Sequence, residues 1–338
     1  MDLDRLTAYL KINKPELLAD GDLTARLIPG GRSNLTYELG TSWVLRRPPL
    51  GHVLATAHDM AREHRVLSGL ADSPVPVPRP LLLCADPDVL GAPFYVMERV
   101  AGTVHRSPGA VRAALGEPGA EALADDLVRV LTALHGLAPA QYGLADFGRP
   151  EGFLERQVRR WRGQLDASRS RPVEGIDELA DRLGRLVPPT QRHSIVHGDY
   201  RLDNCLVGAD GRVAAVLDWE MSTLGDPLTD LGLLRVYWSI GAGIVASPAP
   251  GSDAAGDSPL VPPERMIAGY ADSSDLDLEP LPWYVAFGYF KLAVILEGIH
   301  YRYTRGKTVG AGFETVGAAV APLVAAGLAA LDRDGMEG

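Results

Sequence analysis

The sequence predicts an α+β protein of two lobes: a strand-rich N-terminal lobe over residues 1–100 and a larger, mainly helical lobe over residues 101–338. Short runs with period-two alternation, separated by glycine and proline turns, fill the first part of the chain. Long helical patterns follow beyond Val100-Ala101-Gly102. A length of 338 residues also exceeds the roughly 250–300 residues at which a single hydrophobic core stops growing.

The N-terminal lobe is predicted to be an antiparallel meander with one packed helix. Residues 3–18 carry apolar positions at helical spacing and indicate a short helix ahead of the sheet. Residues 55–70 indicate a second helix, which lies against the sheet. The proline-rich segment 73–80 cannot donate a regular ladder of hydrogen bonds, so it is predicted to be an extended connector. The predicted strands cover residues 23–28, 35–39, 42–46, 81–85 and 94–98.

The C-terminal lobe is predicted from longer periodic segments around a β-like core at residues 194–219. Between two of these helices, residues 241–263 are rich in glycine, alanine, serine and proline and predict a long mobile loop. Such a loop either closes over a substrate or is a tolerated insertion. The predicted helices cover residues 120–136, 151–168, 176–187, 227–240, 263–271, 283–303 and 313–331.

Charge and composition exclude several classes of protein. A formal net charge of −10 argues against a nucleic-acid-binding surface. Cys84 and Cys205 are too few for a disulfide framework. The longest nearly apolar run, residues 316–331, is shorter than the roughly 20 residues of a membrane-spanning helix, and the first residues lack a secretory signal. We expect a cytoplasmic protein without nucleic-acid or membrane partners; its oligomeric state and protein partners stay open.

The strongest chemical signal is the segment His197-Gly198-Asp199-Tyr200-Arg201-Leu202-Asp203-Asn204, which lies between two apolar runs. After a turn, a second apolar strand ends at Asp218, and the resulting hairpin brings Asp218 close to Asn204. Transfer of a phosphoryl group from ATP needs a carboxylate that orients the attacking hydroxyl, together with oxygen ligands for magnesium. Asp199, Asn204 and Asp218 can supply these groups.

In these residues the chain resembles the aminoglycoside phosphotransferase and choline kinase-like family, over most of its length. The family's catalytic loop is His-Gly-Asp with an Asn after four intervening residues, and it occurs here without a gap. The family's later Gly-Asp-Pro and Asp also occur, as Gly225-Asp226-Pro227 and Asp230. The resemblance implies a protein-kinase-like bilobal fold and an ATP- and Mg²⁺-dependent phosphotransferase acting on a hydroxyl of a small molecule. It also implies Asp199 as the catalytic base and Asn204 and Asp218 as the magnesium ligands.

Some of these residues also have structural interpretations. His197 is expected to brace the loop rather than to transfer protons. Asp226 before Pro227 suits a helix N-cap whatever the function, and Asp230 is expected to brace the catalytic loop. Arg201, two residues after the expected base, either reaches the transferring phosphate or faces solvent.

The resemblance implies that the N-terminal lobe holds the nucleotide. A glycine-rich turn between two predicted strands lets the backbone approach phosphates, although the same turn suits a plain hairpin. Its candidate contacts are Gly30, Gly31, Ser33 and Asn34. Kinase-like folds also hydrogen-bond adenine through the connector between the lobes, which implies contacts from Glu98, Arg99 and Val100.

The strand that presents a lysine to the phosphates in kinase-like folds carries arginines here. Period-two alternation places Val44 and Arg46 on one face, and Leu45 and Arg47 on the other. The family pattern favours Arg46 as the phosphate contact, with Glu63 of the next helix as its partner. Arginine is a permanently charged, bidentate donor with a geometry different from that of lysine. A plain surface ion pair is the alternative.

The acceptor is the least defined part of the predicted function. Residues 44–49, 62–67 and 217–220 look most like the kinase-like domains fused to, or grouped with, acyl-CoA dehydrogenases. That likeness favours a hydroxylated metabolite over an antibiotic, and the acceptor can also be an acyl thioester or an aminoglycoside. Carboxylates that could meet an aminoglycoside, such as Glu220, are present, but acidic loops are usually solvated. A catalytically weak nucleotide-binding module is the alternative function, because the lysine is missing.

Overall fold

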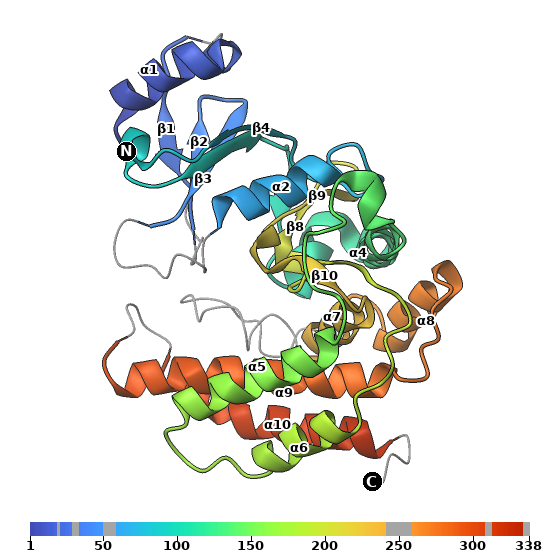
Figure 1. Ribbon diagram of the computed structural model, residues 1–338. Coiled ribbons are helices and arrows are strands. Elements are labelled where there is room, and N and C mark those ends of the chain that lie inside the picture. The colour runs from blue at the N-terminus through green and yellow to red at the C-terminus, as the bar shows by residue number, and fades with distance from the viewer. Residues whose placement is uncertain (19–20, 29–33, 50–58, 241–257, 308–312, 334–338) are drawn as a thin grey trace.

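A computed structural model of the protein describes residues 1–18, 21–28, 34–49, 59–240, 258–307 and 313–333. An antiparallel sheet with α2 against it lies at one end of the molecule, and a group of long helices lies at the other (Figure 1). Two short-stranded sheets lie between them. The predicted α+β architecture, a sheet-containing N-terminal part and a mainly helical C-terminal part, is confirmed. The boundary near residue 100 stays a prediction.

The N-terminal sheet is five-stranded and antiparallel, in the order β1-β2-β3-β5-β4. Its two faces join different cores. Leu45 packs on the outer face with Leu6 and Leu10 of α1 (Leu3–Asn13), whereas Val44 packs on the inner face with α2 (Met60–Leu70) and the rest of the molecule. The strands are β1 (Ala25–Leu27), β2 (Leu35–Leu39), β3 (Trp43–Arg47), β4 (Pro80–Cys84) and β5 (Phe94–Glu98).

Several predicted boundaries of this lobe need correction. The helix predicted over residues 55–70 begins at Met60, because Asp59 caps it, and residues 55–58 lie outside the described residues. The first helix ends at Asn13 because Pro15 follows, and residues Pro15–Leu18 form a separate 3-10 turn, η1. The predicted connector 73–80 starts with bends at residues 73–75 and has no regular structure over 76–79, and its last residue, Pro80, begins β4 and pairs with Met97. Proline is tolerated there because it is the first residue of an edge strand, and the register shifts directly after it. The short helix α3 (Pro87–Leu90) was missed.

The segments that carry Asp199, Asn204 and Asp218 adjoin two small sheets. In one, β7 (Ser194–Val196) pairs with β10 (Thr223–Gly225); in the other, β8 (Cys205–Val207) lies between β6 (Thr103–Val104) and β9 (Val213–Val216). The sequence predicts the central β core but not β6 or β10, because strands of two or three residues carry no measurable alternation.

The C-terminal helices follow the predicted order, with α5, α6, α9 and α10 grouped at the far end of the molecule (Figure 1). The helix predicted over residues 120–136 lies in the part of α4 that follows Gly116, whose φ of +70° and ψ of 175° are not helical. The segment before Gly116, which Ser107 caps and Pro108 opens, was missed. No helix of the described residues is long and apolar enough to cross a bilayer. The helices are α4 (Pro108–His135), α5 (Phe153–Ser168), α6 (Ile176–Arg185), α7 (Leu228–Ile240), α8 (Pro263–Ser273), α9 (Leu281–Thr304) and α10 (Val320–Asp332).

Candidate active site

The loop after β7 is held in place by the buried carboxylate of Asp230, at the start of α7. Its Oδ2 accepts a hydrogen bond from the backbone N–H of His197 (2.6 Å), and its Oδ1 accepts one from Gly198 (2.8 Å). His135 Nε2 lies 3.3 Å from Oδ2. Burial alone would raise the pKa of Asp230, but the bonds from His135 and His197 hold it below its usual value. The bracing role predicted for Asp230 is therefore present.

We expect Asp230→Asn to lower the free energy of unfolding at pH 7 by about 3–5 kcal/mol, since the two loop N–H groups lose a buried, charged acceptor. A carboxyl whose folded pKa is depressed stabilises the fold above its unfolded pKa, and this contribution disappears as the pH falls through the folded pKa. The wild type should therefore lose more stability than the variant between pH 7 and pH 3. Urea unfolding across this range checks the prediction, with the exposed Asp72→Asn as the control. Parallel curves for wild type and variant would contradict it.

Asp199 presents its carboxylate between two donors. The Tyr237 hydroxyl, from the last turn of α7, donates to Asp199 Oδ1 (2.6 Å). The Asn204 amide nitrogen donates to Asp199 Oδ2 (3.1 Å) and to the Asp199 backbone carbonyl (2.9 Å). The two carboxylate oxygens are thus fixed in orientation by neutral groups. Tyr237 lies within a predicted helix, and its contact with Asp199 could not be predicted because it depends on how α7 docks against the loop.

His197 is fully buried, and its two ring nitrogens have different partners. Its Nδ1 accepts from the Asp199 backbone N–H (3.2 Å), so its Nε2 carries the proton and donates to the Leu217 carbonyl (2.9 Å). The imidazole therefore joins the catalytic loop to the strand end before Asp218, as its predicted bracing role requires.

Asp218 follows β9 in a left-handed backbone conformation. Its φ of +65° is the only positive φ among the non-glycine residues that the structure describes. Such a conformation costs of order 1–3 kcal/mol and persists only where its surroundings impose it. The backbone N–H of Leu217 donates to the Asn204 carbonyl (2.8 Å), which brings the ends of β8 and β9 together. The hairpin geometry predicted from the sequence is therefore present.

Arg46 lies at the centre of a group of three carboxylates. Its Nε is 3.1 Å from Glu63 Oε2 of α2, and its Nη2 contacts Asp218 and lies 3.8 Å from Glu220 Oε2. Burial works against the charge of Arg46, but the neighbouring carboxylates hold its pKa above the usual value. Burial raises the pKa of Glu63 to about 7, and Arg46 opposes this rise. The predicted pair of Arg46 and Glu63 is present and buried, so the alternative of a plain surface pair is wrong.

Arg47 points to the opposite face of the sheet. Its Nη1 donates to the Leu90 carbonyl (2.7 Å), beside the outer core of the lobe. The strand alternation that separates Arg46 from Arg47 is therefore as predicted.

The glycine-rich turn is only partly visible. Gly30, Gly31 and Ser33 lie outside the described residues. Asn34 is described, and its Nδ2 donates to Glu220 Oε2 (3.1 Å). Glu220 therefore faces the N-terminal lobe, although the sequence analysis considered it only as a possible acceptor contact. The sequence places Glu220 only two residues after Asp218. In the structure the 3-10 turn η4 (Trp219–Met221) brings both carboxylates to Arg46.

Arg201 does not face solvent. Its guanidinium is buried, pairs with the Asp203 carboxylate through two contacts, and lies 4.4 Å from the centre of the Tyr237 ring. The solvent-facing alternative is therefore wrong, and the predicted phosphate contact is not tested. Asp203 and Tyr237 fix the position of this cation two residues after Asp199.

In the connector between the lobes, two of the three residues predicted to bind adenine donate their backbone N–H groups to other residues of the protein. The N–H of Glu98 donates to the Arg79 carbonyl (2.9 Å), and the N–H of Arg99 donates to the Ser42 carbonyl (2.8 Å). Among the hydrogen bonds of the described residues, none uses the N–H of Val100. Of the three predicted residues, Val100 is therefore the one whose backbone N–H has no hydrogen-bond partner among the described residues.

Lys291 of α9 also reaches the catalytic loop and was not singled out from the sequence. Its Nζ donates to the Gly198 carbonyl (2.6 Å) and lies 5.6 Å from the centre of the Trp161 ring. Burial lowers the pKa of Lys291, while the charges of Asp199 and Asp230 oppose the change.

Gly198 must be glycine here, because its φ is +83° and a Cβ would lie 2.8 Å from the Met221 carbonyl oxygen.

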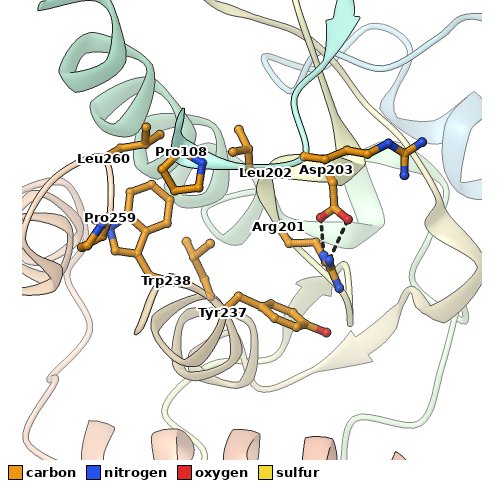
Figure 2. A pocket seen from close by; sticks show the side chains of 10 residues that line it. Pro108, Arg201, Leu202, Asp203, Tyr237, Trp238, Pro259 and Leu260 are labelled. Carbon is orange, nitrogen blue, oxygen red and sulfur yellow. Dashed lines mark hydrogen bonds and ion pairs between the residues drawn. The ribbon is translucent and has the colours of Figure 1, made fainter. Parts of the chain in front are cut away.

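A pocket borders the catalytic loop on the side of α7 (Figure 2). Its lining residues surround about 500 Å³ of space that protein atoms do not fill, part of it open to solvent, and Tyr237 belongs both to its wall and to the surroundings of Asp199. Apolar side chains dominate its lining, with Arg201 and Asp203 joined to each other at one side. The lining residues are Arg106, Pro108, Arg201, Leu202, Asp203, Leu234, Tyr237, Trp238, Pro259 and Leu260.

The predicted loop 241–263 is described only from residue 258 onward, so most of the segment predicted to be mobile lies outside the described residues.

Sequence comparisons identify related proteins. The profile of the phosphotransferase enzyme family matches residues 24–264. Acyl-CoA dehydrogenase family member 11 of Gallus gallus is 34% identical over 319 residues, which make up 91% of this chain and 40% of that protein. Acyl-CoA dehydrogenase family member 10 of Mus musculus is 33% identical over 290 residues, 83% of this chain and 27% of that protein. The chain thus spans less than half the length of either relative, and the predicted resemblance to their kinase-like regions is confirmed.

Solved structures share the fold. A crystal structure of a candidate aminoglycoside phosphotransferase from Ralstonia eutropha matches with a TM-score of 0.81 and 31% identity, over 98% of both chains. An aminoglycoside phosphotransferase in ternary complex with AMP-PNP and hygromycin B matches with a TM-score of 0.61, over 96% of this chain and 98% of that chain. At 14% identity, this second match supports the fold alone.

Proposed function

Because the chain belongs to the phosphotransferase enzyme family, we propose that it transfers the γ-phosphoryl group of ATP, with Mg²⁺, to a hydroxyl group of a small molecule. The observation that carries this proposal is the position of Asp199: its carboxylate is held between Tyr237 and Asn204, on a loop whose neighbouring strand ends at Asp218. A carboxylate fixed in this way can orient an acceptor hydroxyl and accept its proton during transfer.

The magnesium site is proposed at Asn204 and Asp218. Because the Asn204 amide nitrogen donates to Asp199, its Oδ1 is the atom that can ligate a cation. Three carboxylates, those of Glu63, Asp218 and Glu220, face the single guanidinium of Arg46, and this excess of negative charge suits a divalent cation. No three His, Cys, Asp or Glu side chains of the described residues form a metal site by themselves, so the proposed site needs the Asn204 amide and phosphate oxygens as well. When bound, the cation neutralises charge on the phosphates.

The nucleotide is proposed to lie between the five-stranded sheet and the catalytic loop. Arg46 is the proposed phosphate donor, and Val100 offers its N–H to the adenine. Asn34 lies on the same side as Glu220 and completes the phosphate end of the site. Arg201 is proposed to contact the transferring group, since Asp203 and Tyr237 hold its charge two residues after Asp199.

The pocket beside α7 is the proposed acceptor site. Its wall contains Tyr237, which contacts Asp199, so an acceptor in the pocket can bring a hydroxyl to the base. Among the described lining residues most are apolar and two are arginines, whereas the one carboxylate of this described lining, Asp203, is paired with Arg201. These features favour a hydroxylated metabolite with an apolar part over a polycationic aminoglycoside.

A screen of ATP consumption tests this function. The protein is incubated with ATP and Mg²⁺ and a panel of hydroxylated metabolites and aminoglycosides, and ADP release above the acceptor-free rate is measured. We expect acceptor-dependent release with a hydroxylated metabolite that has an apolar part. Release with aminoglycosides alone would contradict the proposed acceptor class, and the absence of acceptor-dependent release with either class would contradict the proposed transfer.

Removal of the proposed metal ligands gives a further prediction. Asn204→Ala and Asp218→Ala should each raise the Mg²⁺ concentration for half-maximal ATP binding by about tenfold or more, because each removes one oxygen ligand. Titration of Mg²⁺ at fixed ATP measures the change. Asp210→Ala, at the turn of the same hairpin, is the matched control, since within the described part of the chain the Asp210 carboxylate accepts only from the local Arg212 N–H. An unchanged metal dependence in both variants would overturn the ligand assignment.

A further inference from the structure

A second cavity lies on the outer face of the N-terminal sheet, on the opposite side of β3 from Arg46. It is formed between the start of α1, strands β2 and β3, and α3, and it holds about 720 Å³ of space that protein atoms do not fill, part of it open to solvent. The lining residues are Met1, Asp2, Arg5, Leu35, Tyr37, Arg47, Val89, Leu90 and Gly91.

Arg47 is the unusual residue of this cavity. Only 3% of its surface is exposed, so its guanidinium is nearly removed from water. Its Nε donates to the Pro48 carbonyl (3.2 Å) and its Nη1 to the Leu90 carbonyl (2.7 Å). Its Nη2 is buried and has no hydrogen-bond partner among the described residues. Burial lowers the pKa of Arg47, with only Tyr37 opposing the change.

A buried guanidinium without a carboxylate is unfavourable, because the loss of hydration is not offset by an opposite charge. The contrast with Arg46, one residue earlier on the same strand, is direct: Arg46 contacts two carboxylates and lies near a third. No described carboxylate forms an ion pair with Arg47. Arg47 thus has an unused donor and an unneutralised charge at the wall of an open cavity.

The other polar groups of the cavity do not neutralise Arg47. The carboxylate of Asp2 caps α1 by accepting from the Arg5 backbone N–H (3.0 Å), and its second oxygen lies 3.5 Å from Arg5 Nε. Arg5 adds a second positive charge to the rim, and its Nη1 donates to the Asp88 carbonyl (3.2 Å). The remaining walls are apolar or aromatic, from Leu35, Tyr37, Val89 and Leu90.

We propose that this cavity binds a small organic anion, a carboxylate or a phosphate monoester with an apolar part, whose oxygens pair with Arg47. The open space is large enough for a compact ligand rather than a single ion, and arginine binds either oxyanion in bidentate fashion. The site is independent of the proposed phosphotransfer, because it lies on the opposite face of β3 from Arg46.

Titration calorimetry with the full chain tests the proposal. Phenyl phosphate and benzoate are the two probes, and they distinguish the phosphate from the carboxylate form of the ligand; benzylamine is the probe of opposite charge. We expect saturable binding of at least one anionic probe and no binding of benzylamine. Arg47→Met should lose one equivalent of that binding or weaken it about tenfold or more, as the loss of a charge-assisted hydrogen bond implies.

Two further variants keep the test decisive. Val89→Trp fills the cavity from α3 and leaves Arg47 in place, so it should also lose the same equivalent of binding. Arg26→Met removes an exposed arginine of the same sheet, which pairs with Glu38 outside the cavity, and should bind as the wild type does. Binding that survives in both Arg47→Met and Val89→Trp would place the anion elsewhere and overturn the proposal. Equal binding of benzylamine, or no binding of either anionic probe, would overturn it as well.

Discussion

Asp199→Asn is expected to lower kcat for phosphoryl transfer by about 10²–10⁴-fold, the range that a positioned general base contributes. The amide keeps the size of the side chain but cannot accept the proton of the acceptor hydroxyl. The dissociation constant for ATP should change little, because Asp199 contacts Tyr237 and Asn204 and none of the residues proposed to hold the base or the sugar of the nucleotide. Acceptor-dependent ADP release measures kcat, and calorimetry measures ATP affinity.

A matched control separates this role from a loss of folding. Asp210 lies on the turn of the hairpin that follows the catalytic loop, and the Asp210→Asn variant should keep wild-type kcat. If Asp199→Asn lost ATP affinity in proportion to its loss of turnover, the carboxylate would be a nucleotide-binding group and its assignment as the base would be wrong.

Arg46→Met is expected to weaken ATP binding by about 10–100-fold and to lower the free energy of unfolding by about 3–5 kcal/mol. The first effect follows from the loss of the proposed phosphate donor. The second follows because Glu63, with 1% of its surface exposed, would keep a buried carboxylate without its cation. Calorimetry with ATP and urea unfolding measure the two effects separately.

The pH dependence of the Arg46→Met variant has a definite sign. Burial already raises the pKa of Glu63 to about 7 from an ordinary value of 4.5, and the loss of Arg46 raises it further. A carboxyl whose folded pKa is raised favours folding at low pH and loses that contribution as the pH rises through the folded pKa. The variant should therefore be closer to wild-type stability at pH 5 than at pH 8. A stability deficit that is the same at both pH values would contradict the unpaired Glu63 carboxylate as its cause.

Second-site changes distinguish the two roles of Arg46. Glu63→Gln added to Arg46→Met should restore much of the stability without restoring ATP binding.

Arg47→Ala, on the opposite face of β3, should weaken ATP binding less than Arg46→Met does. Arg46→Lys tests the fork geometry: retained activity would show that the site tolerates the commoner lysine, and lost activity would show that bidentate contacts are needed. Equal small effects at Arg46 and Arg47 would show that another residue holds the phosphates.

The sequence predicts the fold well where its elements are long or strongly alternating. The strands 35–39 and 94–98 match β2 and β5, and the alternation at residues 44–47 correctly assigns the two faces of β3. Errors occur where another effect overrides the pattern. Pro80 enters β4 because an edge strand needs no donor from its first residue. The helical turns before Gly116 were missed, because they form a separate segment that Ser107 caps and that the non-helical backbone of Gly116 ends.

The candidate site also has parts that the sequence could predict and parts that it could not. The sequence spacing of Asp199, Asn204 and Asp218 was sufficient to predict that these residues lie close together, because a single tight hairpin connects them. Tyr237, Lys291 and the buried state of Arg201 could not be predicted, because each depends on the packing of α7 or α9 against the loop. Contacts between residues far apart in the chain leave no local pattern in one sequence.

The most direct test of the account is detection of the phosphorylated acceptor itself. The protein is incubated with Mg²⁺, the acceptor found by the ATP-consumption screen and ATP labelled in its γ-phosphoryl group, and the acceptor is analysed by mass spectrometry beside the Asp199→Asn variant. We expect the wild-type protein to transfer the labelled phosphoryl group to the acceptor hydroxyl and the variant to do so only at a trace level. Tight ATP binding by both proteins, with no labelled acceptor above the level of the variant, would instead identify a nucleotide-binding module without turnover.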